Sequence, residues 1–202
     1  MGKTVDYYFS PMSPWTYLGH ARFADMAQRH GAVIKVKPVD FGKVFPLSGG
    51  LPLAKRAPQR QAYRMVELKR FRDYLKVPLN LQPKFFPVPA DLAAQFIVAA
   101  GQAAGSDAAM RLAGAVLRAC WAEERNIADA ETLGAICKEQ GMDAAALAAA
   151  AQSEAVKAEY AGYTQEAIAR NVFGAPSYVI DGEIFWGQDR LDFVERRLAQ
   201  RA

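Results

Sequence analysis

Residues 5–18 read VDYYFSPMSPWTYL, and this stretch decides the fold of the chain. Residues 5–9 are strand-like, and Pro14 suits the first position of a helix, where the missing N–H of a proline would have had no partner. Ser13 therefore lies where unpaired backbone N–H groups and the positive end of the helix dipole stabilise an anion, a thiolate included. The serine is either a simple helix cap or a catalytic group.

The elements on either side of this junction follow a β-α-β order. We expect a strand over residues 3–9, a helix over 14–30 and a second strand over 33–39. Two strands joined through a helix favour a parallel pair with a right-handed crossover. Residues 40–57 are interrupted by glycines and prolines, and we expect them to form a long loop.

The rest of the chain is mostly helical until its last thirty or so residues. A helix is expected over about 58–76, and nearly everything from 91 to about 171 reads as helical and alanine-rich. Strand character returns in residues 176–186, where an Asp-Gly pair predicts a hairpin with a two-residue turn. A last helix is expected to begin near Asp189.

Composition excludes several classes of protein. The chain has 202 residues, 51% hydrophobic and 23% charged, with a net charge of +4. It has no long basic run for nucleic acid and no apolar run long enough for a membrane, so the mild positive charge favours a small anionic substrate. Cys120 and Cys137 form no C-x-x-C and are read as buried thiols in preference to a disulfide or redox pair. With only two histidines, no metal site is expected. Separately, we expect a cytoplasmic protein.

The order of elements is that of an α/β, thioredoxin-like fold with a large inserted all-helical domain. We expect residues 1–45 and 155–202 to form the thioredoxin-like part, and 46–154 the insertion. In this fold a cis-proline before the third strand faces the start of the first helix. Pro176 stands at that place, although an isolated proline is more often a trans residue that opens an edge strand.

The redox members of this fold carry C-x-x-C at the start of the first helix. Here the corresponding residues are Ser13 and Thr16, so both sulfurs are missing. Dithiol–disulfide exchange requires a thiolate on the protein, which argues strongly against a redox enzyme. A serine at this position makes sense if the sulfur belongs to a ligand, because the hydroxyl can donate to a bound thiolate whose pKa the helix dipole lowers.

Three motifs then occur in the right order: SPWTYL at residues 13–18, FGAPS at 173–177 and FWGQDRL at 185–191. With them the chain resembles the 2-hydroxychromene-2-carboxylate isomerases, within the glutathione-dependent kappa class of glutathione transferases. The resemblance extends over nearly the whole chain. It implies glutathione as cofactor and a homodimer as the assembly.

The resemblance also implies roles for individual residues. Ser13 would contact the glutathione sulfur as the catalytic residue, Ala175 would pair its backbone with the cysteinyl part, and Asp189 would bind the γ-glutamyl ammonium. For Arg190 an ion pair with a neighbouring aspartate, Asp189 or Asp192, is equally compatible. The glutathione-binding residues implied are Ser13, Pro14, Trp15, Ala175, Pro176, Gln188, Asp189 and Arg190.

Basic residues of the helical part are candidates for the substrate carboxylate. They are Lys43, Arg56, Arg60 and Arg64. Such residues usually form a solvated face, but Arg60 and Arg64 are four residues apart on one side of a helix and can receive a carboxylate together. The chain departs from the family at Gly49-Gly50, where relatives often carry an asparagine, and this affects the expected substrate contacts.

The expected function is a glutathione-dependent isomerase that interconverts 2-hydroxychromene-2-carboxylate and trans-o-hydroxybenzylidenepyruvate, or a related aromatic enone acid. One alternative is a kappa-class transferase, which would use the same activated thiol but release a permanent conjugate. Another is a non-catalytic binding protein in which Ser13 is only a cap. A redox enzyme is the weakest alternative.

Overall fold

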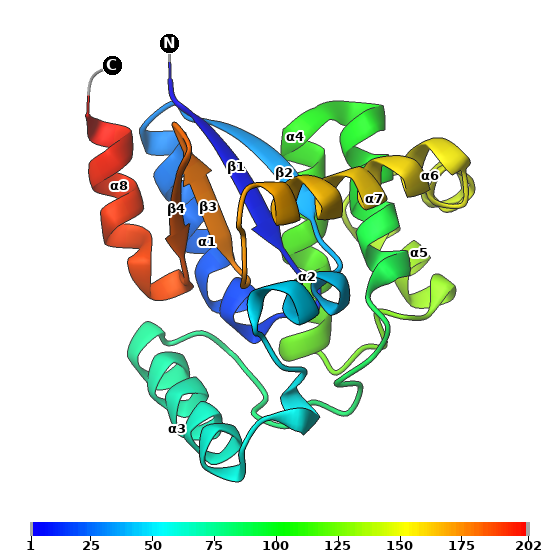
Figure 1. Cartoon of the computed structure of the whole chain (residues 1–202). Coiled ribbons are helices and arrows are strands. Elements are labelled where there is room, and N and C mark those ends of the chain that lie inside the picture. Colours follow the sequence, from blue (N-terminus) through cyan, green and yellow to red (C-terminus); the bar gives the residue numbers. More distant parts are fainter. Residues whose placement is uncertain (1, 201–202) are drawn as a thin grey trace.

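A four-stranded sheet forms the centre of the computed structural model, which describes residues 2–200. The strands are β1 (Thr4–Phe9), β2 (Val33–Pro38), β3 (Ser177–Ile180) and β4 (Glu183–Trp186), in the order β2-β1-β3-β4. β1 pairs in parallel with β2 and antiparallel with β3, and β3 and β4 form a hairpin (Figure 1). The predicted parallel pair and hairpin are confirmed.

Eight helices and two 3-10 turns surround the sheet within residues 2–200. They are α1 (Pro14–Arg29), α2 (Phe41–Ser48), η1 (Leu53–Lys55), α3 (Pro58–Leu75), α4 (Asp91–Trp121), α5 (Ala130–Glu139), α6 (Ala144–Ala151), α7 (Glu154–Ala169), η2 (Gln188–Arg190) and α8 (Leu191–Ala199). None of these helices combines the length and the hydropathy needed to cross a membrane.

The alternation of side chains along β1 makes the sheet the middle layer. Tyr7 and Phe9 point into the larger core, which contains residues of α1, α4 and α8. Tyr8 points to the opposite face, into a smaller cluster with residues of α2 and α7. Successive side chains of a strand face opposite sides of the sheet, so a strand that is apolar on both sides must lie in the middle of the fold.

The inserted helices share the larger core with the sheet. α4 packs against both β2 and α1, and its Trp121 is fully buried. The thioredoxin-like fold with an inserted helical part is therefore confirmed, while the exact boundaries of 1–45, 46–154 and 155–202 stay a prediction.

The loop expected over residues 40–57 is wrong, because α2 and η1 lie within it. The Asp40 side chain accepts a hydrogen bond from the Gly42 N–H and begins α2, and Gly49, with φ 73°, ends it in the left-handed conformation. Phe41 and Val44 are buried in the smaller cluster. Burial of this short apolar face outweighs the helix-breaking residues that suggested a loop.

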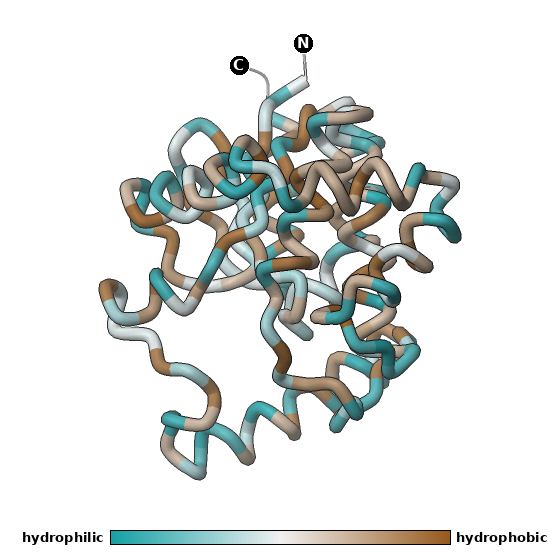
Figure 2. The backbone as a smooth tube through the Cα atoms, turned by 90° about the vertical axis from the view of Figure 1, so that its right-hand side faces the viewer, coloured by the Kyte–Doolittle hydropathy of each residue, from teal (hydrophilic) through white to brown (hydrophobic). Residues whose placement is uncertain are grey.

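α3 lies apart from the other helices at the lower edge of the molecule (Figure 1). In Figure 2 it carries mostly hydrophilic residues and is connected on both sides by extended segments. Only Leu68 of α3 is buried, and Met65, Phe71 and Leu75 pack partly buried against the larger core. One side of this helix is thus apolar and faces the core, and its other side faces solvent.

A buried histidine lies between β1 and α4. The Nε2–H of His20 donates to the Met110 carbonyl at 3.0 Å, since a carbonyl only accepts, and its Nδ1 accepts from the Tyr7 hydroxyl at 3.1 Å. Burial lowers the pKa of His20 from 6.5 to about 4. The folded protein therefore keeps this imidazole neutral.

We predict that His20 makes stability dependent on pH. The unfolded chain protonates His20 below its ordinary pKa of 6.5, whereas the folded protein resists protonation down to about 4. The stabilisation is thus complete above pH 6.5 and is lost as the pH falls toward 4, by about 3 kcal/mol in total. Denaturant unfolding between pH 7.5 and 4 should show a steeper loss of unfolding free energy for wild type than for His20→Gln. Equal slopes would contradict the prediction.

Candidate functional site

Ser13 lies where β1 ends and α1 begins. Its backbone is extended, and its Oγ accepts a hydrogen bond from the Thr16 N–H at 3.2 Å, so it is the N-cap of α1. The Ser13 N–H itself donates to the Ser10 carbonyl at 3.0 Å and holds the turn. Because the cap uses an acceptor lone pair, the hydroxyl proton of Ser13 remains available for a bound anion. The two readings of this serine, cap and anion donor, are compatible.

The Ala175-Pro176 bond is cis, as the order of elements predicted. Tyr8 of β1 pairs with Ser177 of β3, so Pro176 is placed beside the end of β1, where the chain turns toward Ser13. The loop is fixed on both sides, since the Ser177 hydroxyl donates to the Gly174 carbonyl at 2.7 Å and the Gly187 N–H donates to the Pro176 carbonyl at 2.9 Å.

The backbone of Ala175 is open for a ligand. Within residues 2–200 neither its N–H nor its C=O has a protein hydrogen-bond partner. Beside it, the Trp186 indole covers Gly174 so closely that a Cβ there would collide with the ring, and Phe173 packs edge-on to the indole at 4.9 Å. A rigid loop thus presents unpaired backbone groups near the start of α1, which suits an extended peptide-like ligand.

Gln188 and Asp189 lie in η2, directly after β4, and point in opposite directions. Gln188 is 2% exposed, and its side-chain oxygen accepts a hydrogen bond from Arg22 of α1. Asp189 is exposed and pairs with the guanidinium of Arg190 at 2.8 Å. Of the two ion pairs considered for Arg190, the structure has the one with Asp189. Of these two side chains, only the carboxylate of Asp189 is therefore placed to meet a ligand.

The basic candidates are brought together only in part. Lys43 is exposed on α2, with its ammonium 3.7 Å from Asp40. Arg56, Arg60 and Arg64 lie next to one another around the start of α3, and none has a carboxylate within 4 Å in the described part of the chain. These three unpaired positive charges thus lie together around the start of α3.

Arg64 is the most enclosed of these arginines. Its guanidinium lies over the rings of Phe86 and Trp121, at 5.4 and 5.9 Å from their centroids. Burial, together with the nearby charge of Arg56, lowers the pKa of Arg64 to about 10. The Trp121 indole N–H donates to the carbonyl of Met12, the residue before Ser13, at 3.2 Å. An arginine without a carboxylate partner is thereby connected to the Ser13 turn through one tryptophan.

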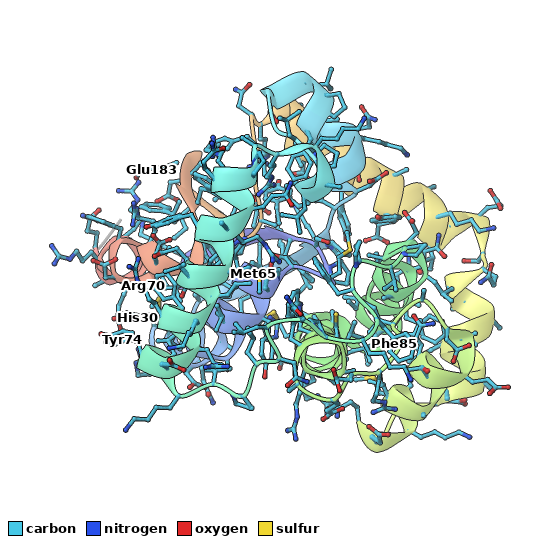
Figure 3. All side chains as sticks on the ribbon, turned by 90° about the horizontal axis from the view of Figure 1, so that it is seen from below. His30, Met65, Arg70, Tyr74, Phe85 and Glu183 are labelled. Atoms are coloured by element: carbon cyan, nitrogen blue, oxygen red, sulfur yellow. The ribbon has the colours of Figure 1, made fainter. Side chains whose placement is uncertain are left out.

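α3 faces the start of α1 with one side. Trp15 packs edge-on against Phe71 at 6.1 Å, and the Tyr17 hydroxyl donates to the Pro78 carbonyl at 2.6 Å. Seen from below in Figure 3, α3 crosses in front of α1, and Arg70 and Tyr74 lie on the side opposite Met65. Trp15 is therefore partly a packing residue between the two helices.

The chain is similar to known proteins along nearly its whole length. The family model of the DsbA-like thioredoxin domain matches residues 4–199. A 2-hydroxychromene-2-carboxylate isomerase from Sphingobium xenophagum is 33% identical over 199 residues, which cover 98% of this chain and 99% of the relative. The chain belongs to the 2-hydroxychromene-2-carboxylate isomerase family. A solved structure of such an isomerase is similar with a TM-score of 0.80 and 27% identity, covering 96% of this chain and 93% of that one.

Membership of this family makes the chain an isomerase with a DsbA-like thioredoxin fold. A shorter match connects it with the kappa class: a glutathione S-transferase kappa 1 from Caenorhabditis elegans is 33% identical over 82 residues, which cover 40% of this chain and 36% of the relative. The family resemblance drawn from the three sequence motifs is confirmed.

Sequence reasoning missed three residues of the site: Arg22, Phe86 and Trp121. No motif marks them, since each acts through a contact with a residue far away in the chain. Arg22 reaches Gln188, 166 positions later, and Trp121 reaches Met12, 109 positions earlier. In the sequence Arg22 is an ordinary polar residue of a helix, and only the folded structure shows that η2 lies beside it.

Both cysteines of this isomerase are buried and unpaired with each other, as predicted. Burial raises the pKa of the Cys120 thiol to about 12 and that of Cys137 to about 11. Neither side chain supplies a thiolate at neutral pH. Any thiolate chemistry at Ser13 must therefore use sulfur from a ligand.

We predict that both thiols are inert in the folded protein. At pH 7.5 a thiol-specific disulfide reagent should label fewer than about one in ten cysteines within minutes, because the groups are buried and protonated. After denaturation both cysteines should react completely. Rapid labelling of the native protein would contradict the prediction and reopen the redox alternative.

Proposed function

We propose that this isomerase uses glutathione and interconverts 2-hydroxychromene-2-carboxylate with trans-o-hydroxybenzylidenepyruvate, or acts on a related aromatic enone acid. The observation that carries the proposal is the Ser13 turn. A hydroxyl with an available proton stands at a helix N-terminus, next to a rigid cis-proline loop with an unpaired backbone, in a protein without a reactive thiol.

The residues present fit glutathione. Ala175 offers an unpaired N–H and C=O for the cysteinyl part, and the exposed carboxylate of Asp189 suits the γ-glutamyl ammonium. The ion pair of Asp189 with Arg190 also leaves a guanidinium beside that position for the γ-glutamyl carboxylate. When bound, glutathione would supply a thiolate that adds to the conjugated carbon of the enone, so that the former double bond becomes a single bond that can rotate, and elimination of the thiolate would then restore the double bond with trans geometry.

The protein's own contribution is to stabilise the sulfur anion and to orient the enone. Ser13 would donate a hydrogen bond from its hydroxyl to the thiolate, while the Trp15 N–H and the dipole of α1 would lower the pKa of the thiol. These donors are fixed by the cap and by the Ser13–Ser10 bond before any ligand arrives. Fixed donors cost no reorganisation during the reaction, so they favour the charged form.

Arg64 is proposed to bind the substrate carboxylate. A desolvated guanidinium without a carboxylate partner gains most from a ligand that brings one, and the planar fork suits bidentate contact. Phe86, which is only partly buried, adds aromatic surface for the substrate ring, and the fully buried Trp121 supports Arg64 from below. Arg56 and Arg60 add positive charge at the entrance. Gly50 approaches Phe45 at this side of α2, where relatives often carry an asparagine, so the substrate ring is proposed to contact aromatic surface there.

A kappa-class transferase is the second candidate, favoured by the partial match to the Caenorhabditis elegans relative. The same thiolate would attack an electrophile and stay attached. Supplying an aryl halide with glutathione distinguishes the two, since a transferase yields a stoichiometric conjugate whereas an isomerase consumes no thiol. A cytoplasmic homodimer stays a prediction of the family resemblance.

We predict that Ser13→Ala lowers kcat about 100-fold, because one donor to the developing anion is lost while the other glutathione contacts remain. Isomerisation followed by absorbance measures this, and calorimetry should show glutathione affinity within a few-fold of wild type. Ser13→Thr keeps a hydroxyl and should retain more activity than Ser13→Ala. If Ser13→Ala left both turnover and binding unchanged, the serine would be only a cap.

We predict that Arg64→Met raises KM for the aromatic acid about ten-fold or more, because a charge-assisted contact to the carboxylate is lost. The KM for glutathione should stay within two-fold. Arg70→Met is the matched control: Arg70 lies on the outer side of α3, paired with Glu67 at 2.6 Å (Figure 3). If Arg64→Met raised the KM for a neutral ester of the substrate by the same factor as the KM for the acid, Arg64 would not bind the carboxylate.

A further inference from the structure

Arg22 makes the direct side-chain bridge between α1 and η2. One of its terminal nitrogens, Nη2, donates both to the backbone carbonyl of Gln188, at 3.0 Å, and to the side-chain oxygen of Gln188. Its Nε–H donates weakly to the Leu18 carbonyl at 3.4 Å. Within residues 2–200 no carboxylate lies within 4 Å of this guanidinium. The positive charge is therefore satisfied by neutral oxygens alone, two of which belong to Gln188.

Burial lowers the pKa of Arg22, which is the sign of a desolvated cation. Withdrawing a charge from water costs free energy unless strong contacts replace the lost hydration. A leucine or methionine could fill part of the space between α1 and η2 without that cost. An arginine here is explained by what it holds, the backbone and side chain of Gln188.

The surface of α1 around Arg22 is shaped to receive Gln188. A Cβ at Gly19 would stand 2.7 Å from the Gln188 Cβ, so Gly19 lets η2 lie directly on the helix. Gly19 and Arg22 are three residues apart and share one face of α1. Gln188 thus packs against Gly19 on this face of α1 and accepts hydrogen bonds from Arg22 beside it.

Fixing Gln188 fixes the rest of the proposed thiol site. Asp189 is the next residue, and its carboxylate points outward. On the other side, the Gly187 N–H binds the Pro176 carbonyl at 2.9 Å. η2 is therefore tied to the cis-proline loop through Gly187 and to the helix of Ser13 through Arg22. Ser13 and Arg22 are nine residues apart on one rigid helix, roughly 13 Å along its axis.

We infer that Arg22 is a positioning residue that sets the distance between Ser13 and Asp189 and thereby selects thiols that carry a γ-glutamyl group. The inference rests on the proposed function, in which Ser13 holds the sulfur and Asp189 the γ-glutamyl ammonium. Arg22 touches neither sulfur nor substrate. It keeps the Asp189 carboxylate where the far end of a glutathione-sized ligand arrives.

The test compares glutathione with cysteinylglycine, which has the same thiol but lacks the γ-glutamyl group. For the wild-type protein, the KM for glutathione should be lower than the KM for cysteinylglycine. Arg22→Met keeps the apolar stem of the side chain but loses its donors, and should raise both the KM for glutathione and the glutathione dissociation constant measured by calorimetry roughly ten-fold or more. Its kcat at saturating glutathione and its KM for cysteinylglycine should each stay within about two-fold of wild type.

Two further variants keep the test decisive if Arg22→Met folds poorly. Arg22→Lys keeps the charge on a shorter side chain, so its ammonium reaches the two Gln188 oxygens less well than Nη2 does, and it should show an intermediate loss of preference for glutathione over cysteinylglycine. Gln188→Leu removes the side-chain acceptor and leaves the backbone carbonyl, and should also act on glutathione alone. Arg29→Met is the control on the same helix, because Arg29 is exposed and paired with Glu195 at 2.8 Å.

The outcomes separate the two levels of the proposal. Wild-type isomerisation that does not depend on any thiol would overturn the proposed function. If wild-type isomerisation depends on a thiol but Arg22→Met prefers glutathione over cysteinylglycine as strongly as wild type does, only the role of Arg22 would be overturned. A KM raised equally for both thiols would also overturn it, since that result means a general structural defect. A KM that rises for glutathione but not for cysteinylglycine supports the inference.

Discussion

The packing of Tyr7 at the centre of the sheet is the contact on which the rest of the structure depends. Its ring stacks on Phe9 at 4.7 Å and on Tyr178 of β3 at 5.4 Å, and it packs against Phe23 of α1 at 4.9 Å. Each such pair contributes about 1 kcal/mol beyond the burial of its area. The cluster joins β1, β3 and α1, which are the elements that carry Ser13 and the cis-proline loop. Packing far inside the fold thus determines where the thiol site lies.

Two parts of the chain divide the proposed chemistry between them. The thioredoxin-like part provides Ser13, the open backbone of Ala175 and the carboxylate of Asp189, all suited to a peptide thiol. The inserted part provides Arg64 and its aromatic support. Trp121, which belongs to the insertion and bonds to Met12, joins them. In this account the site at the start of α1 binds a sulfur that comes from the ligand, and the insertion determines which acid is accepted.

The sequence was sufficient for features that depend on local chemistry. The parallel pair, the Asp-Gly hairpin and the Ser13 cap follow from strand pattern, turn residues and a proline at the first helical position. α2 was missed because Pro46 and Gly49 suggested a loop, while burial of Phe41 depends on elements far away in the chain. The inward orientation of the Gln188 side chain could not be predicted from the sequence either, since only the folded chain places Arg22 beside it. Long-range contacts, not propensities, decided these details.

The most direct measurement of the central claim is the pKa of the thiol of bound glutathione, from the ultraviolet absorbance of its thiolate as a function of pH. An unperturbed cysteine thiol titrates near 8.5, and a helix N-terminus with a donated hydroxyl should lower that value by roughly one to two units. The protein's own thiols titrate far above this range and do not interfere. A bound thiol that titrates with the same pKa as glutathione in water would contradict the account, because Ser13 and α1 would then stabilise no anion.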